Sequence, residues 1–167
     1  MTTILVVLAC VIVALAVGAA YFLRRTPVNQ AALDNAMLVS SGLAIEQARV
    51  DHGVHLDGSP ESVEQVEAIL AALNEQHRLQ PIPFLKLANM AGRWGAYIGE
   101  AAKRARAGAW NNRGLVHDDG VMVFPADWAR ARILGGPEDN VWNKFQLTYF
   151  GDRFRALDLS ASDGEAT

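Results

Sequence analysis

Three long stretches of the chain carry apolar residues at the spacing of an α-helix. The first spans 29–53 and has a stop signal at Gly53, and the second spans 59–79 with Ser59 placed to cap it. The third begins at Phe84, after the break QPIPF, and is expected to continue to about Ala107. The stripes predicted to face the core are Leu33, Ala36, Met37, Leu43, Ala44 and Ala48 in the first helix, and Val63, Val66, Ile69, Leu70 and Leu73 in the second.

Short β-prone runs replace this pattern after Gly108. Asp119-Gly120 lies between Leu115–His117 and Val121–Phe124, a strong signal for a hairpin, and Trp110 is placed to begin a preceding strand. Two further helices are expected over 125–136 and 137–150, the second with Val141, Trp142, Phe145 and Tyr149 on one face. The pattern therefore predicts the α+β class: a mostly helical domain with a small antiparallel sheet.

The N-terminal segment 2–23 contains no charged residue, and about 20 apolar residues are enough for a helix to cross a bilayer. Its flanking bases, Arg24 and Arg25, follow the apolar run, whereas a signal peptide has its bases in front. We interpret the segment as an uncleaved single-pass transmembrane helix. Because basic flanks stay on the cytoplasmic side, the N-terminus should lie outside and the domain in the cytoplasm, at a bacterial inner membrane.

The expected organisation has three parts. Residues 1–25 form the transmembrane anchor and its basic flank, 26–158 form a cytoplasmic α+β domain, and 159–167 form a polar, disordered tail.

Charge and cysteine content narrow the possible chemistry. The net charge is −3, and six bases with only one acid, Glu100, lie within 79–117, between two acidic segments. This order suggests intramolecular neutralisation, which makes nucleic acid an unlikely partner. The single cysteine, Cys10, lies in the apolar segment, so the domain has neither a disulfide framework nor a cysteine metal site.

The helix expected after Phe84 carries the main candidate face for a ligand or partner. Arg93, Tyr97, Glu100 and Arg104 follow one another at intervals of four, three and four residues, so they share one side, and Trp110 comes shortly afterwards. Neighbouring bases favour the charged form of Glu100, which suits a structural acceptor better than a general acid. The face is thus either structural or the lining of a ligand site.

Three glycines on the same helix, Gly92, Gly95 and Gly99, also need a cause, because glycine costs about 1 kcal/mol relative to alanine inside a helix. One explanation is close packing of another element, such as the sheet, on the helix backbone. The other is a groove that holds a ligand.

Metal and catalytic motifs are weak. His52 and His55 could join His77 and His117 around zinc only through the tertiary fold, and His117-Asp118-Asp119 lies at a turn, where aspartates also serve the backbone. No phosphate loop or nucleophile motif is present. We therefore predict no catalytic residue, no metal and no cofactor.

Two stretches, WGAYIGEAAKRARAGAW (94–110) and VFPADWARARILGGPEDNVW (123–142), are similar to a bacterial family of small domains of unknown function. That family combines a Gly-Ala-aromatic-aliphatic-Gly-Glu helix with a Gly-x-Trp strand, a hairpin, a helix beginning near proline and a Gly-Glu-Asp turn. The resemblance implies a shared α+β fold and no reaction; Pro137 departs from the pattern. The matching positions are Gly95, Ala96, Tyr97, Gly99, Glu100, Gly108, Trp110, Pro125, Gly136, Glu138 and Asp139.

These features favour a membrane-anchored accessory or protein-interaction subunit, with the bilayer and either another protein or further copies of the chain as partners. The alternative is a membrane-bound enzyme or small-ligand sensor that uses the Arg93/Tyr97/Glu100/Arg104 face.

Overall fold

The structure, a computed structural model, describes residues 29–151. The predicted anchor, its basic flank and the predicted tail lie outside the described residues. Within 29–151, no helix combines the length and the apolar character needed to cross a membrane. The elements are α2 (Gln30–His52), α3 (Val63–Leu79), α4 (Phe84–Ala105), β1 (Gly108–Trp110), β2 (Leu115–His117), β3 (Met122–Val123), α5 (Pro125–Gly135), the 3-10 turn η1 (Pro137–Asp139) and α6 (Val141–Tyr149).

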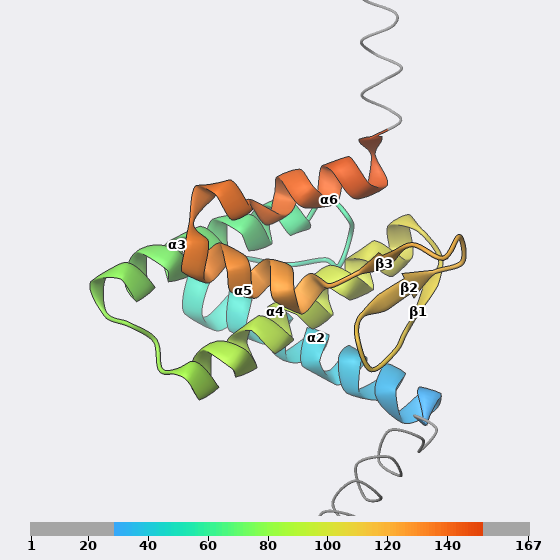
Figure 1. The fold of residues 1–167 in the computed structure, drawn as a ribbon. Helices are drawn as coiled ribbons and strands as arrows, with labels where there is room; N and C mark the ends of the chain where they lie inside the picture. Colours follow the sequence, from blue (N-terminus) through green and yellow to red (C-terminus); the bar gives the residue numbers. More distant parts are fainter. Residues whose placement is uncertain (1–28, 152–167) are drawn as a thin grey trace, which may run out of the picture.

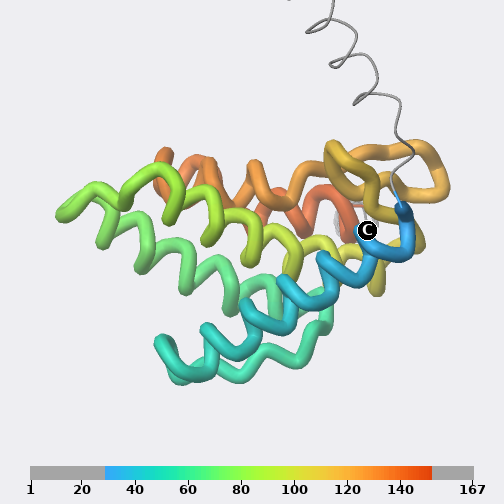
Figure 2. Tube along the Cα trace, turned by 90° about the horizontal axis from the view of Figure 1, so that it is seen from below, coloured from blue at the N-terminus to red at the C-terminus, as the bar shows by residue number. Residues whose placement is uncertain are grey.

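Helix α4 is the centre of the arrangement. It packs against α2 and α5, while α3 packs against α5 and α6 (Figure 1). The sheet lies at the end of the bundle where α4 ends and α5 begins, and the turn between α3 and α4 projects at the opposite end. The tube view places α2, blue to cyan, along the outside of the bundle (Figure 2). The predicted α+β class, mostly helical with a small sheet, is confirmed.

The helix ends follow local chemistry. Asn29 caps α2 by accepting a hydrogen bond from the Ala32 amide at 3.2 Å, and Gly53 ends the helix in the left-handed conformation, as predicted. Helix α3 begins at Val63, later than expected, because residues 59–62 form a separate turn in which the Ser59 hydroxyl accepts from the Ser62 amide. The predicted helix over 137–150 is divided into η1 and α6, with Asn140 capping α6.

The sheet is an antiparallel meander in the order β1-β2-β3. Gly108 pairs with His117 and Trp110 with Leu115, while Leu115 also pairs with Val123. The predicted hairpin is confirmed: the Gly120 amide donates to the His117 carbonyl at 2.8 Å, and Gly120 has a φ of 84° that glycine tolerates best. This turn fixes β2 and β3 in register beside the end of α4.

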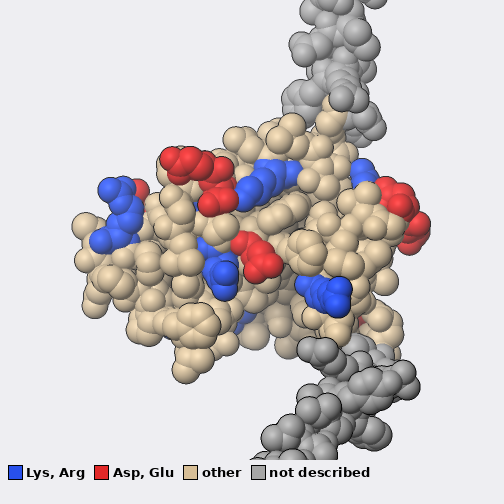
Figure 3. Space-filling view, in the orientation of Figure 1, with Lys and Arg blue, Asp and Glu red and all other residues tan. Residues whose placement is uncertain are grey.

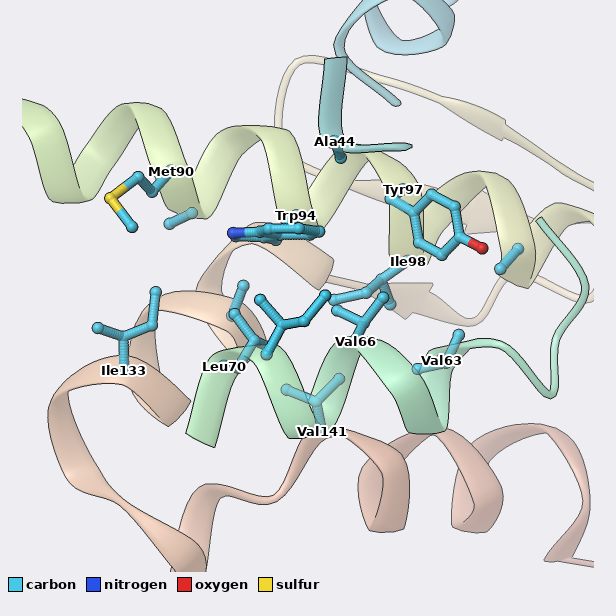
Figure 4. Packing of buried hydrophobic residues seen from close by; sticks show 14 of the residues in the cluster. Ala44, Val63, Val66, Leu70, Met90, Trp94, Tyr97, Ile98, Ile133 and Val141 are labelled. Atoms are coloured by element: carbon cyan, nitrogen blue, oxygen red, sulfur yellow. The ribbon is translucent and has the colours of Figure 1, made fainter. Parts of the chain in front are cut away.

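The core forms where α3, α4 and α5 meet (Figure 4). Trp94 and Ile98 of α4 lie against the α3 side chains Val66 and Leu70, with Ile133 of α5 nearby, and all five are buried. Burying each such side chain contributes about 1.5–3 kcal/mol. The stripe predicted for α3 is therefore the buried one, as expected.

The stripe predicted for α2 is correct at four of its six positions. Ala44 and Ala48 are buried and Leu33 and Met37 pack on the core, but Ala36 and Leu43 are exposed. The reason is that α2 has apolar residues on two opposite sides, and only one of them faces α4.

Candidate functional site

The candidate residues on α4 do not converge on one point. Tyr97 is buried, and its hydroxyl accepts a hydrogen bond from the Gly58 amide at 2.9 Å and shares another with the Ser62 hydroxyl. Burial raises the pKa of the Tyr97 phenol, so the side chain stays neutral. Tyr97 thus holds the loop before α3 onto α4.

Arg104 serves the same loop. Its guanidinium donates to the Asp57 carbonyl at 3.3 Å and covers Gly58, where a Cβ atom would overlap the arginine side chain. Gly58 also has a φ of 75°, which favours glycine. The loop around Gly58 is therefore fixed by two side chains of α4, Tyr97 and Arg104, which lie about two helical turns apart.

Glu100 faces the sheet. Its Oε1 accepts from the Trp110 indole nitrogen at 2.7 Å and lies 3.4 Å from the Lys103 ammonium. Trp110 is itself buried, so its ring is part of the core and is not an exposed anchor for a partner. The Glu100 carboxylate thus positions β1 on α4, the structural role that the sequence favoured for it.

Arg93 is exposed and lies apart from the other three. It lines a cleft of about 700 Å³ between α2, α3 and α4. Both signs of charge face this cleft, and the buried Gln47 Oε1 atom has no hydrogen-bond partner among the described residues. The cleft is lined by Gln47, Asp51, His52, Leu73, Gln76, Lys86, Asn89, Met90 and Arg93.

The three glycines of α4 do not all have the same surroundings: two allow close packing, and the third borders a hollow. A Cβ atom on Gly95 would overlap the backbone of Ala126 at the start of α5, and one on Gly99 would overlap the Trp110 ring. These two glycines therefore allow close packing. At Gly92, nothing in the described residues outside the local helix backbone lies within 4 Å of a Cβ position, and this residue lines a hollow of about 220 Å³ that Gly95 and Trp110 also border.

The sequence offered His117 only as a candidate metal ligand beside a turn, whereas in the structure it is a buried polar anchor. Its Nδ1 lies 3.1 Å from the Ala107 carbonyl and its Nε2 lies 2.7 Å from the Tyr149 hydroxyl. Because a carbonyl only accepts, Nδ1 carries a proton, and in the neutral imidazole Nε2 then accepts from the Tyr149 hydroxyl. Burial raises the pKa of the Tyr149 phenol. Both ring nitrogens are occupied, which leaves His117 no free atom for a metal.

The cluster around Tyr149 ties the hairpin to α6. The Arg106 guanidinium lies 5.5 Å from the centre of the Tyr149 ring and pairs with Asp119 at 3.0 Å. It also donates to the Thr148 carbonyl at 3.0 Å. Asp119 is therefore engaged by Arg106 and by the turn itself, where it accepts from the Val121 amide.

The other histidines are dispersed. His77 Nδ1 accepts from the Ile82 amide at 3.0 Å, His52 lies beside the Trp94 ring, and His55 is exposed. Within residues 29–151, no three His, Cys, Asp or Glu side chains are grouped so as to hold a metal ion.

A buried ion pair joins three helices, and the sequence pattern also missed it. Glu67 of α3 accepts from the Arg132 Nε atom at 2.6 Å and from the Val141 amide at 2.7 Å, at the start of α6. Its signal was faint: a single acid inside the apolar stripe of α3. The pair fixes α3, α5 and α6 together, and removal of one partner of such a pair typically costs about 3–5 kcal/mol.

Three of the most exposed large apolar side chains of the described residues lie at the turn between α3 and α4. Leu79, Phe84 and Leu85 are 87%, 72% and 76% exposed, and we call these three residues the apolar tip. In the space-filling view, the corner where α4 begins shows neither blue nor red atoms, while elsewhere both signs of charge are interspersed (Figure 3). An exposed cluster of this kind is typical of an interaction surface.

The turn that carries the apolar tip has a restricted backbone. Pro81 and Pro83 restrict the backbone between the helices, and Ile82 turns inward and is buried, with its amide bonded to His77. A surface that is already ordered loses less entropy when it binds.

A scan against protein-family models found no match for the chain, and searches of curated proteins and of solved structures found none either. The similarity to a bacterial small-domain family therefore stays a prediction.

Proposed function

We propose that the chain is a membrane-anchored accessory subunit without catalytic machinery, whose domain binds a protein partner through the apolar tip. The anchor part of the proposal rests on the uncharged segment 2–23 and on Arg24 and Arg25, which favour an inner-membrane location with the domain in the cytoplasm. The single observation that carries the binding role is the exposure of Leu79, Phe84 and Leu85 at one turn, which contains Pro81 and Pro83.

Two properties of the domain support this assignment. Tyr97, Glu100 and Arg104, the residues that most resembled a reactive constellation, bond to groups of their own chain. The side chains of the apolar tip, in contrast, are exposed and are not part of the core of the described domain. A few buried anchors, often aromatic, supply most of the binding energy at protein interfaces, and Phe84 is the aromatic residue of the apolar tip.

The alternative, a membrane-bound enzyme or small-ligand sensor, has support only at Arg93. This residue lines the polar cleft together with the unpartnered Gln47 carbonyl, whereas the other three members of the predicted face serve the loop and the sheet. We therefore place the interaction subunit first.

The test is affinity capture of the full chain from detergent-solubilised native membranes. A triple variant, Leu79→Ser with Phe84→Ser and Leu85→Ser, is compared with Leu147→Ser on α6, where Leu147 is 76% exposed and matches Leu85. We expect a stoichiometric partner with the unmodified chain and with Leu147→Ser, and at least a tenfold loss with the triple variant. Equal capture by all three, or no stoichiometric partner, would contradict the proposal.

A further inference from the structure

Helix α2 has a second apolar side that the fold does not use. Its inner side packs on α4 through Ser41, Ala44 and Ala48, which are buried. The residues on the opposite side are all exposed, and they recur at intervals of four, three, four, three and four positions. We call this set the α2 seam: Ala32, Ala36, Val39, Leu43, Glu46 and Val50.

The spacing of the α2 seam is the one that two paired helices require. Apolar residues that alternate every three and four positions keep one line of contact along a partner helix, as in a coiled coil. Five of the six seam positions are apolar, and Val39, Leu43 and Val50 are 56%, 49% and 62% exposed. The only charged residue between Gln30 and Ile45 is Asp34, which lies off the seam and is half-buried. A helix side that only meets water does not need this repeat.

We infer that the α2 seam pairs with the same seam on a second copy of the chain. The inference rests on the membrane anchor of the proposed function. The segment 2–23 ends close to Gln30, and the residues between them extend to at most about 20–25 Å. Two anchored copies in one bilayer therefore present their seams at the same height and with the same chain direction.

The residues of the seam suit a symmetric, parallel pair. Ala32 and Ala36 allow close approach near the anchors, and the larger Val39 and Leu43 follow. At the far end Glu46 pairs with Arg49 of its own helix at 2.6 Å, with both side chains largely exposed. In a parallel pair each Glu46 can take the Arg49 of the other copy, so the one charged seam position has a partner of opposite sign.

The anchors are also needed for affinity. A single helix pair buries less than the roughly 1,000 Å² of an interface that is stable by itself. Confinement to one membrane raises the effective concentration of the second seam, as a short linker does between two binding modules. Pairing is thus expected in the membrane and not between dilute, anchor-free domains.

The test is disulfide cross-linking of the full chain in isolated native membranes. In a Cys10→Ser background, single cysteines are introduced by Val39→Cys, Leu43→Cys and Val50→Cys. Leu38→Cys is the matched control, because Leu38 neighbours Val39 and is 61% exposed but points away from the seam. We expect all three seam variants to form covalent dimers on mild oxidation, at least tenfold more than the control.

Each other outcome overturns the inference in a recognisable way. Equal dimer yields for Val39→Cys and Leu38→Cys would indicate random collision. Dimers at one seam position only would indicate crossed or antiparallel helices. No dimer at any position would mean that lipid or a different protein covers the seam. Alkaline extraction of the same membranes tests the anchor separately. If the chain is extracted, it is not anchored, and the proposed function is contradicted. If the chain stays in the membrane but forms no cross-link, only the pairing is contradicted.

Discussion

The two ends of α4 lie in contrasting surroundings. At its C-terminal end, Tyr97, Glu100 and Arg104 all bond to the loop before α3 or to the sheet. At its N-terminal end, Phe84 and Leu85 extend into solvent next to Leu79. The end with the richer chemistry is the structural one, and the plain apolar end is the one available for binding. A concentration of polar and aromatic residues is therefore a poor guide to function in this helix.

Among changes to α4 itself, the largest effect should come from its packing against α5. Gly95→Ala places a Cβ atom against the Ala126 backbone, and we expect a net loss of about 1–3 kcal/mol in the free energy of unfolding. Gly92→Ala, where that position is open, should gain up to about 1 kcal/mol from helix propensity. Urea denaturation of both variants measures the difference. Equal effects would mean that α5 does not approach α4 at Gly95.

The next effect concerns the loop that Tyr97 holds. Tyr97→Phe removes the acceptor of the buried Gly58 amide, which should cost about 1–3 kcal/mol. Ser62→Ala leaves the bond to Gly58 intact and should cost less. Denaturation curves of the two variants test this order, and a larger loss in Ser62→Ala would show that the hydroxyl pair dominates.

The same tyrosine predicts an alkaline limit to stability. Burial raises the folded-state pKa of Tyr97, and also that of Tyr149, while unfolded tyrosine ionises near pH 10. Stability contributed by the neutral phenols is thus fully present below about pH 10 and is lost as pH rises toward the raised folded-state values. Thermal unfolding in this range should show a steeper decline for the unmodified chain than for Tyr97→Phe. Parallel declines would mean that Tyr97 does not titrate differently on unfolding.

The smallest effect on folding should come from the opposite end of the helix. The triple serine variant of the apolar tip should change the free energy of unfolding by no more than about 0.5 kcal/mol per site, because the replaced side chains are exposed. Leu70→Ala, in the core, should cost about 2–5 kcal/mol. A tip variant as unstable as Leu70→Ala would show that the tip is part of the core and is not a free surface.

Local patterns predicted the elements well and their contacts less well. Gly53 as a helix end, Asp119-Gly120 as a hairpin and the stripe of α3 all depend on neighbouring residues, and each is confirmed. The inner side of α2 was ambiguous, because apolar residues on both sides of a helix give no unique direction. Leu43 was therefore assigned to the core although it lies on the exposed side.

The contacts of the candidate residues could not be predicted from the sequence, because their partners lie far away along the chain. The spacing of Arg93, Tyr97, Glu100 and Arg104 correctly placed them along one helix, but their partners lie in other elements, and Tyr97 meets Gly58 from 39 positions away. The contacts of Glu67 and His117 were missed for the same reason. Arg132 lies 65 positions from Glu67, and Tyr149 lies 32 positions from His117. No local signal encodes such pairs.

The position of His117 makes it an internal spectroscopic probe. Its ring is held between the carbonyl that follows α4 and the hydroxyl that closes α6. The imidazole proton should therefore exchange slowly with solvent and give one sharp nuclear magnetic resonance signal only while α6 is docked. Anything that loosens that helix, such as a fused tag, a bound protein or a truncation, would be visible at this one nitrogen before the rest of the domain responds.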